Sequence, residues 1–123
     1  MDADRTASWT LSKAASGVIY SKFIGPTPLD ELLKFIAALD ALMPESNAKL
    51  VFDLRELGGY NSEAKEPMKA WILKRKLAIR ELTVVVPKSG VILKMVTAAI
   101  ALATGVKISI REDFADAASF AAQ

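Results

Sequence analysis

A strand that runs into a glycine turn and then into a helix start is the feature that most constrains how this chain can fold. Leu50 to Leu54 is almost continuously apolar, which is typical of a strand buried on both faces of a parallel sheet. The pair Gly58-Gly59 follows, and then Asn61 and Ser62, which are residue types that begin helices. Because backbone N–H groups converge at a helix start, this segment is also the first candidate for binding an anion or carrying a phosphate.

The remaining segments alternate between strand-like and helix-like patterns and predict one α/β domain over residues 1–123. The order β-β-α-β-α-β-α-β-α indicates a mixed, mainly parallel sheet that opens with a hairpin. If every crossover steps the same way along the sheet, all helices fall on one face. We expect strands at Trp9 to Lys13, Val18 to Phe23, Leu50 to Leu54, Leu82 to Val86 and Val106 to Ile110, and helices at Pro28 to Met43, from a start between Asn61 and Pro67 to Lys76, at Val91 to Thr104 and at Phe114 to Ala122.

Polar or conformationally special residues mark the expected helix ends. Thr27 precedes a proline and is the predicted N-cap of the first helix, and Asp113 is the predicted N-cap of the last. Either Asn61 or Ser62 is suited to cap the second helix. Gly105 is expected in the left-handed conformation that ends the third helix.

The third helix, Val91 to Thr104, is apolar nearly all round. We expect such a helix to be buried on several sides, either in its own core or against a partner. An open sheet edge is also expected at the leading hairpin. These two features together predict a homodimer.

The 123 residues include no histidine and no cysteine, which excludes Ser-His-Asp triads, cysteine nucleophiles, thiolate or imidazole zinc sites and disulfides. Asp53, beside Arg55 at the end of the central strand, is either a catalytic carboxylate or, more commonly, a salt-bridged one, and no second carboxylate is placed to share acid and base roles. We therefore expect no catalytic residue, no metal and no cofactor. Because the first residues lack the apolar core of a signal peptide, we expect a cytoplasmic protein.

The positive charge of the chain is concentrated in one segment. The formal net charge is +2, yet residues 65–94 hold eight basic residues and two acidic ones. Lys65, Lys69 and Lys76 fall within roughly 40° of one another if the second helix lasts to Lys76. This basic stripe is either a solvated face or a contact for an acidic protein or an anionic membrane surface. Nucleic acid is not an expected partner, because neither a broad basic surface nor interleaved aromatic residues are evident.

The hairpin-first order, with a third strand that leads through a serine into a helix, resembles the STAS family of anti-sigma-factor antagonists. The segment Lys49 to Glu81 is most similar to a bacterial STAS-like branch, with Asp-Leu-Arg-Glu-Leu after the strand and a Val-Val-Val strand after a basic helix. The antagonists carry a phosphorylatable serine in an Asp-Ser-Ser-Gly-like turn. The matching stretch reads Asn61-Ser62-Glu63-Ala64, so Ser62 takes the serine's place and the other three positions differ. The resemblance implies a non-enzymatic domain that binds a protein or, in some members, a nucleotide or lipid.

Three functions follow from these observations. We expect first a regulatory protein-binding module without catalysis, whose interaction residues are Tyr60, Asn61, Ser62, Asp53 and Arg55, with Ser62 acting either as a phosphorylation switch or only as a helix cap. The second is a domain that binds a small ligand, a lipid or a membrane surface through the basic second helix and an apolar pocket. The third is an enzyme, which the absence of an acid–base pair makes the least expected.

Overall fold

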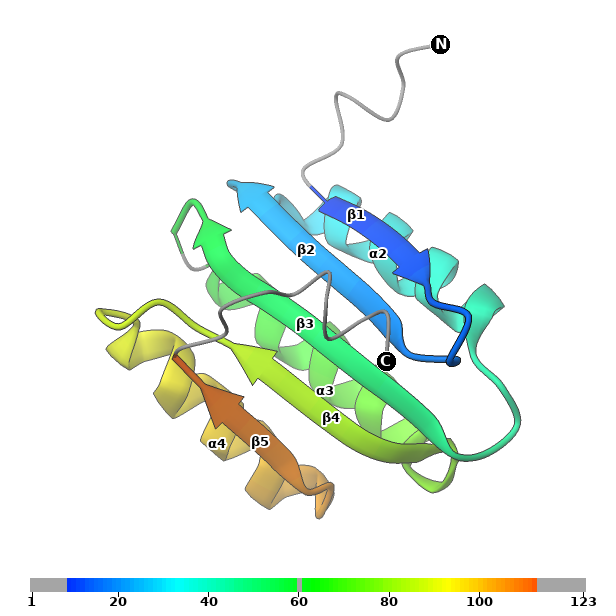
Figure 1. Ribbon diagram of the computed structural model, residues 1–123. Helices are drawn as coiled ribbons and strands as arrows, with labels where there is room; N and C mark the ends of the chain where they lie inside the picture. The colour runs from blue at the N-terminus through cyan, green and yellow to red at the C-terminus, as the bar shows by residue number, and fades with distance from the viewer. Residues whose placement is uncertain (1–8, 60, 113–123) are drawn as a thin grey trace, which may run out of the picture.

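The computed structural model of the protein describes residues 9–59 and 61–112, which form one sheet flanked by helices (Figure 1). The last helix expected at Phe114 to Ala122 and its cap Asp113 lie outside the described residues. Two of the elements, η1 and η2, are single turns of 3-10 helix. In chain order the elements are β1 (Trp9–Lys13), β2 (Ile19–Gly25), α2 (Leu29–Leu42), β3 (Ala48–Leu57), η1 (Ser62–Ala64), α3 (Lys65–Lys74), η2 (Lys76–Ala78), β4 (Ile79–Val85), α4 (Val91–Thr104) and β5 (Ile108–Arg111).

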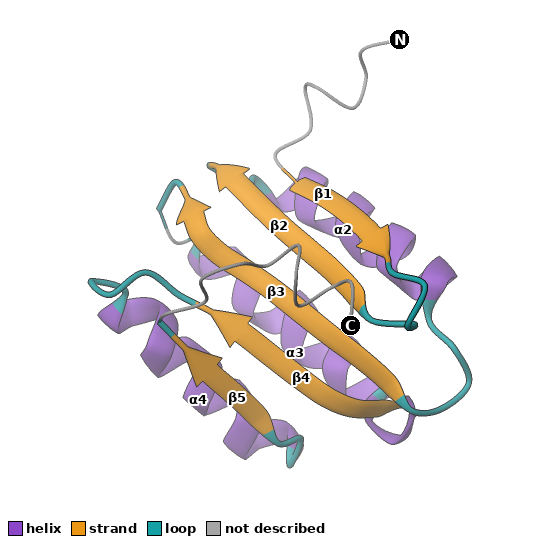
Figure 2. Cartoon of the chain, viewed as in Figure 1, coloured by secondary structure: helices purple, strands orange, loops and turns teal. Residues whose placement is uncertain are grey.

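The strands lie side by side in the order β1-β2-β3-β4-β5, which is also their order along the chain. β1 pairs antiparallel with β2, and the other three pairs are parallel. Because each crossover steps in the same direction, α2, α3 and α4 all cover one face of the sheet (Figure 2). The leading hairpin, the central place of β3 and the mixed, mainly parallel α/β architecture are therefore confirmed.

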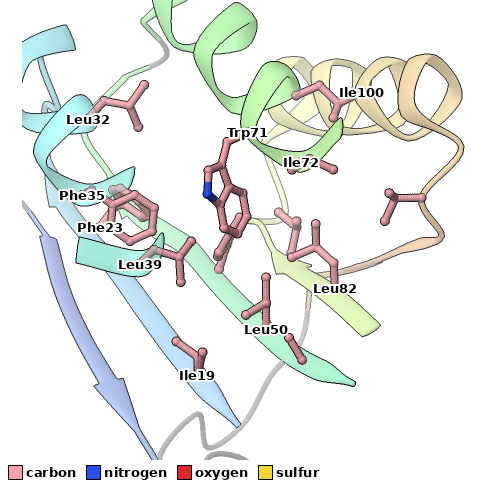
Figure 3. Close-up of a cluster of buried hydrophobic side chains, with 14 of the residues drawn as sticks. Ile19, Phe23, Leu32, Phe35, Leu39, Leu50, Trp71, Ile72, Leu82 and Ile100 are labelled. Carbon is pink, nitrogen blue, oxygen red and sulfur yellow. The ribbon is translucent and has the colours of Figure 1, made fainter. Parts of the chain in front are cut away.

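The main core lies between the helices and the face of the sheet that they cover. Side chains alternate along a strand, so Leu50 and Phe52 of β3 point toward the helices, while Val51 and Asp53 point to the other face. Figure 3 shows core side chains from all three helices directed into this layer: Leu32, Phe35 and Leu39 from α2, Trp71 and Ile72 from α3, and Ile100 from α4.

Phe35 of α2 is the centre of an aromatic cluster and has no exposed surface. Its ring meets those of Trp9, Phe23 and Phe52 edge to face, with centroid separations of 5.5, 4.7 and 5.9 Å. Each such pair contributes about 0.5–1.5 kcal/mol beyond its buried area. This cluster joins α2 to the first three strands of the sheet.

Helix ends agree with the sequence in part. α4 has the expected bounds, and Gly105 follows it with φ +75° and donates its N–H to the carbonyl oxygen of Ala101 at 2.9 Å. The prediction that Thr27 caps the first helix is wrong, because α2 begins one residue later, after Pro28, and no side chain makes the capping hydrogen bond. The second helix ends at Lys74 rather than Lys76, since the chain must turn to enter β4.

An ion pair between helices holds α3 against α2 at the point where α3 ends. Arg75 donates from Nε and from its terminal nitrogen to the two carboxylate oxygens of Asp40, at 2.6 and 2.7 Å. The indole nitrogen of Trp71 donates to the same carboxylate at 3.0 Å. Hydrogen bonds from Arg75 and Trp71 lower the pKa of Asp40 from 3.8 to about 2, because they favour its charged form.

The outer face of α4 is exposed in the single chain, so of the two expected alternatives, burial of this apolar helix in its own core is wrong and burial against a partner stays a prediction. Thr97, Ile100 and Thr104 face the core, and only this side of the helix is buried. The opposite side carries no charged residue and leaves four large apolar side chains 60–86% exposed: Val91, Ile92, Met95 and Leu102. The helices of the described residues are all too short, or too polar, to cross a bilayer.

Candidate functional site

Two loops touch at the carboxyl ends of β2 and β3. The N–H of Gly58 donates to the carbonyl oxygen of Gly25 at 2.8 Å. A Cβ atom on Gly58 would lie 2.7 Å from the carbonyl carbon of Gly25 and 2.8 Å from the nitrogen of Pro26, so only glycine allows this approach. The contact brings Thr27, from the loop after β2, next to Asn61, from the loop after β3. The Asn61 amide nitrogen lies 3.4 Å from the Thr27 carbonyl oxygen.

Asn61, and not Ser62, is the residue that caps the turn entering the second helix. The side-chain oxygen of Asn61 accepts a hydrogen bond from the N–H of Glu63 at 3.0 Å, and Asn61 has the extended backbone of an N-cap. Ser62 is already the first residue of η1 and is exposed to solvent. The prediction that Ser62 is a helix cap is therefore wrong. Tyr60, the third residue expected here, lies outside the described residues.

A cavity of about 120 Å³ lies behind this pair of loops, between the helix-covered face of the sheet and helices α3 and α4. Its walls are mostly apolar and come from Leu54 and Leu57 of β3, Met68 and Ile72 of α3, and Leu93 of α4. Ile72 and Ile100, which also line it, are seen in Figure 3 pointing into the layer above the sheet. The cavity is therefore enclosed mainly by apolar side chains.

Four polar residues line the same cavity: Thr27, Asn61, Lys65 and Thr97. Thr97 is satisfied, because its hydroxyl donates to the carbonyl oxygen of Leu93 at 2.7 Å. The hydroxyl oxygen of Thr27 has almost no accessible surface and no hydrogen-bond partner among residues 9–59 and 61–112, and Thr27 as a whole is 8% exposed. Lys65 is partly buried at the start of α3, and its ammonium forms no ion pair within residues 9–59 and 61–112.

The three lysines of the expected basic stripe do not lie on one helix. Lys65 and Lys69 belong to α3, but Lys76 lies in η2, because α3 ends at Lys74. Lys76 reaches instead toward the end of α4, where a Cβ on Gly105 would be 3.1 Å from its ammonium nitrogen. Lys69 pairs with Glu66 at 3.0 Å. The predicted geometry of the stripe is therefore wrong, and Lys65 alone of the three lines the cavity.

Asp53 and Arg55 lie on the other face of the sheet, away from Asn61 and Ser62. Asp53 is 1% exposed and accepts hydrogen bonds from the Tyr20 hydroxyl at 2.7 Å and from two guanidinium nitrogens of Arg55 at 3.0 and 2.9 Å. Burial raises the pKa of Asp53, yet the hydrogen bonds from Arg55 and Tyr20 outweigh it and hold that pKa below 3.8. Asp53 and Arg55 thus form a salt-bridged cluster that is separate from Asn61 and Ser62, and the salt-bridged alternative expected for Asp53 is the one that the structure has.

Comparisons with known proteins identify the architecture. No family model and no curated protein matches the chain. A solved structure that resembles it is that of an uncharacterized protein from the DUF3478 family, with a SpoIIAA-like fold, from Shewanella loihica PV-4. The match has a TM-score of 0.65 and 15% sequence identity, and it covers 91% of this chain and 90% of that chain. The fold is SpoIIAA-like. The resemblance to STAS domains is thereby confirmed for the fold, and at this identity for the fold alone.

Within the SpoIIAA-like fold, sequence reasoning missed Thr27 and the cavity that it lines. Thr27 looked like a helix cap, because a threonine before a proline usually has that role. The sequence did contain one sign of this contact, the glycine-containing segments Gly25-Pro26 and Gly58-Gly59, because glycine allows two backbones to approach closely. Tertiary packing decides which side chains line a cavity next to this contact, and no local sequence pattern predicts it.

Proposed function

We propose that the protein is a non-enzymatic binding domain that takes up a small, largely apolar ligand in the cavity behind the Gly25 and Gly58 loops. This is the second of the functions expected from the sequence, and the apolar cavity supports it. One observation carries the proposal: a cavity of about 120 Å³, lined mostly by apolar side chains, lies behind the two loops.

Protein interiors are normally packed to the density of organic crystals. An apolar space of about 120 Å³ beside the core therefore stands out, and a small apolar group placed there would be removed from water on most sides.

The proposal involves no catalysis. Asp53 is the buried carboxylate at the end of the central strand, and its oxygens accept hydrogen bonds from Tyr20 and Arg55. It also faces away from the cavity, which lies on the side of Phe52 and Leu54. A cytoplasmic location stays a prediction from the sequence.

The outer face of α4 supports a second function, the regulatory protein-binding module expected first from the sequence. Val91, Ile92, Met95 and Leu102 are exposed there together, on a helix side without charge. Exposed apolar patches of this kind mark interaction surfaces. A second copy of the chain is the partner that the sequence predicts, and the interaction is compatible with a ligand in the cavity, because Leu93 and Thr97 face inward from the same helix.

The ligand-binding proposal is tested by filling the cavity. Ala64 lines it, so Ala64→Leu places three further carbon atoms inside, whereas Ala70→Leu adds the same group on the exposed side of α3. Titration of the protein with 1-hexanol, followed by NMR, is expected to give saturable binding that Ala64→Leu weakens at least ten-fold and Ala70→Leu leaves unchanged. Equal affinity in all three proteins would place the binding elsewhere and contradict the proposal.

A further inference from the structure

We propose that residues 113–123 of this chain pack as a helix on the face of the sheet that α2, α3 and α4 leave uncovered. This helix-free face, which carries Val51, Asp53, Thr83 and Val85, is on the opposite side of the sheet from the ligand cavity, so the proposal is independent of the proposed function. It depends on three features: the burial of these side chains, the completed ion pair among them and the sequence pattern of residues 113–123.

Two neighbouring rows of side chains on the helix-free face are shielded from water. Val51 of β3 pairs with Thr83 of β4, and in the next row Asp53 pairs with Val85. Their exposed fractions are 1, 8, 1 and 0%, in that order. Figure 2 shows α2, α3 and α4 on the other side of the sheet. Because strand neighbours lie beside a side chain and not above it, burial this complete indicates that a further segment covers the centre of the face.

The described side chains on this face form a small cluster. Val51 and Val85 have three further apolar neighbours within residues 9–59 and 61–112: Val18, Ala14 and Tyr20. Ser109 and Arg111 of β5, which continue the same two rows, are exposed. The cover is therefore narrow and lies over β2, β3 and β4. Three strands span about 10 Å, which is the diameter of one helix.

The charged group on the helix-free face is compatible with an apolar cover. The carboxylate of Asp53 accepts hydrogen bonds from the Tyr20 hydroxyl at 2.7 Å and from the Arg55 guanidinium at 3.0 and 2.9 Å. A charge is tolerated away from water when it is paired and hydrogen-bonded. The partners of Asp53 come from β2 and β3 themselves, so the covering segment contributes apolar surface.

The sequence of residues 113–123 supplies such a surface. Seven of its eleven residues are alanine or phenylalanine. At about 100° per residue in a helix, the polar residues fall on one side: Asp116, Ser119 and Gln123. The opposite side carries alanines in the middle and a phenylalanine at each flank: Ala117, Ala121, Phe114 and Phe120. The alanines allow close approach to the strands, and the two rings extend over the side chains next to them.

The chain also enters this segment at a suitable place. Arg111, the last residue of β5, pairs with Val85, so residues 113–123 start beside the buried rows. β3 lies two strands from β5, a distance of about 10 Å, and a helix of nine residues is about 14 Å long. The segment can therefore cross the face without a linker. Residues 1–8 are a poorer cover, because they include Asp2, Asp4 and Arg5 and no aromatic residue.

This packing turns the helix-free face into a second core layer. Asp53 was expected to be an interaction residue, but under residues 113–123 it is enclosed and holds Tyr20 and Arg55 in place. A protein partner of the full chain is then excluded from this face and is left with the outer face of α4 and the loops.

The test compares the full chain with a chain that ends at Glu112. The probe is a neutral, soluble gadolinium chelate, which relaxes the NMR signals of the methyl groups that it can approach. In the full chain, the methyl groups of Val51 and Val85 should be as protected as those of Leu50, which points to the helix-covered face. In the shortened chain, relaxation should rise several-fold at both valines and stay unchanged at Leu50. Equal relaxation of the valines in the two chains would overturn the proposal.

Two pairs of variants provide matched controls. Deletion of residues 2–8 removes the other terminal segment and should leave the relaxation of Val51 and Val85 unchanged. Ala117→Asp places a charge in the middle of the apolar side, so it should expose the valines as the shortened chain does. Ser119→Asp places the same charge on the polar side and should leave them protected. If Ser119→Asp and Ala117→Asp have the same effect, the helix does not pack through this side and the proposal is overturned.

A measurement on the full chain applies even if the shortened chain does not fold. Nuclear Overhauser effects should connect the ring protons of Phe114 or Phe120 with the methyl groups of Val51 or Val85. A sample mixed from labelled and unlabelled chains shows whether such contacts join two molecules. Contacts within one molecule are expected. Contacts found only between molecules would show that a second copy covers the face, and the lack of any contact from either ring would show that another group does; both results would overturn the proposal.

Discussion

The N–H of Gly58 donates a hydrogen bond of 2.8 Å to the carbonyl oxygen of Gly25, and this contact joins the loops that end β2 and β3. Neither residue has a side chain that would keep the two backbones apart. The contact sets Thr27 beside Asn61 at the end of the apolar cavity. The shape of the candidate site therefore depends on two glycines that do not themselves offer any chemistry to a ligand.

Gly58→Ala should destabilise the protein and distort the site. The added Cβ would lie 2.7–2.9 Å from backbone atoms of Gly25 and Pro26, which cannot move aside as a flexible side chain can. We expect a loss of about 1–3 kcal/mol in the free energy of unfolding, measured with urea, and weaker binding of 1-hexanol. Gly17→Ala is the control: Gly17 has open space around it and φ +96°, so the variant should lose about 1 kcal/mol through its backbone and keep the affinity. If Gly58→Ala is as stable as the wild-type protein, the contact between the two loops does not require glycine at this position.

Asp40→Asn should destabilise the protein at neutral pH and much less in acid. The folded-state pKa of Asp40 is about 2 and its ordinary value is 3.8, so its charge stabilises the fold above pH 3.8, and that contribution is lost as the pH falls from 3.8 to 2. At pH 7 we expect a loss of about 1 kcal/mol, because a partly exposed ion pair is replaced by a neutral hydrogen bond.

Urea unfolding of wild type and Asp40→Asn at pH 7, 4 and 2.5 measures this difference. Glu45→Gln is the control, since Glu45 is exposed and has no ion pair among the described residues. If the free energies of unfolding of wild type and Asp40→Asn differ by the same amount at all three pH values, the carboxylate charge does not hold α2 against α3.

Ser62→Ala and Asn61→Ala should differ in stability. Asn61 accepts the capping hydrogen bond from Glu63, so its loss should cost about 1 kcal/mol, whereas Ser62 is exposed and its loss should change stability by less than about 0.5 kcal/mol. Thermal unfolding of both variants measures the difference. A larger loss of stability in Ser62→Ala than in Asn61→Ala would show that Ser62 is the cap.

The phosphorylation switch at Ser62 stays a prediction. An exposed serine beside a helix start is open to a kinase, and a phosphate there would carry about −1.5 to −2 charge next to Lys65. If the switch operates, a protein partner that docks on this surface should be repelled by Ser62→Asp and tolerate Ser62→Ala, and intact-mass measurement of the protein from its own host should find a phosphorylated form. An unmodified mass under all growth conditions would exclude the switch.

If the homodimer prediction is right, the exposed face of α4 should form the dimer interface. Light scattering during gel filtration should then report twice the chain mass of 13.3 kDa at micromolar concentration. Leu102→Glu, at a side chain that is 86% exposed on this face, should shift the mass to that of one chain, and Leu33→Glu, 50% exposed on α2, should not. A single-chain mass for the wild-type protein at every concentration would contradict the homodimer.

Local patterns were sufficient for the architecture. The continuous apolar run of β3 indicated a central strand, and the apolar stretch between Gly90 and Gly105 gave the bounds of α4, because sterics and capping act over a few residues. The sequence left the stepping of the crossovers as a condition, and the structure shows that each steps the same way. Local patterns could thus predict the mixed, mainly parallel α/β architecture, and the resemblance to STAS domains supplied the fold family.

The candidate site could not be predicted from local patterns, because it depends on contacts between distant parts of the chain. Lys76 seemed to continue the basic face of the second helix, yet that helix ends where Arg75 reaches Asp40, 35 residues away in sequence. Thr27 lost its expected capping role and lines a cavity with Lys65, which comes from another crossover. Periodicity reports which face of an element is apolar, but it does not report where facing surfaces leave a space.

Contacts between a bound probe and the cavity walls test the central claim most directly. With 1-hexanol bound to the wild-type protein, intermolecular nuclear Overhauser effects should connect the terminal methyl group of the probe with the methyl groups of Ile72, Leu93 and Ile100, which line the cavity. Contacts only with Val91, Met95 or Leu102, on the outer face of α4, or the absence of saturable binding, would contradict a ligand site inside the fold.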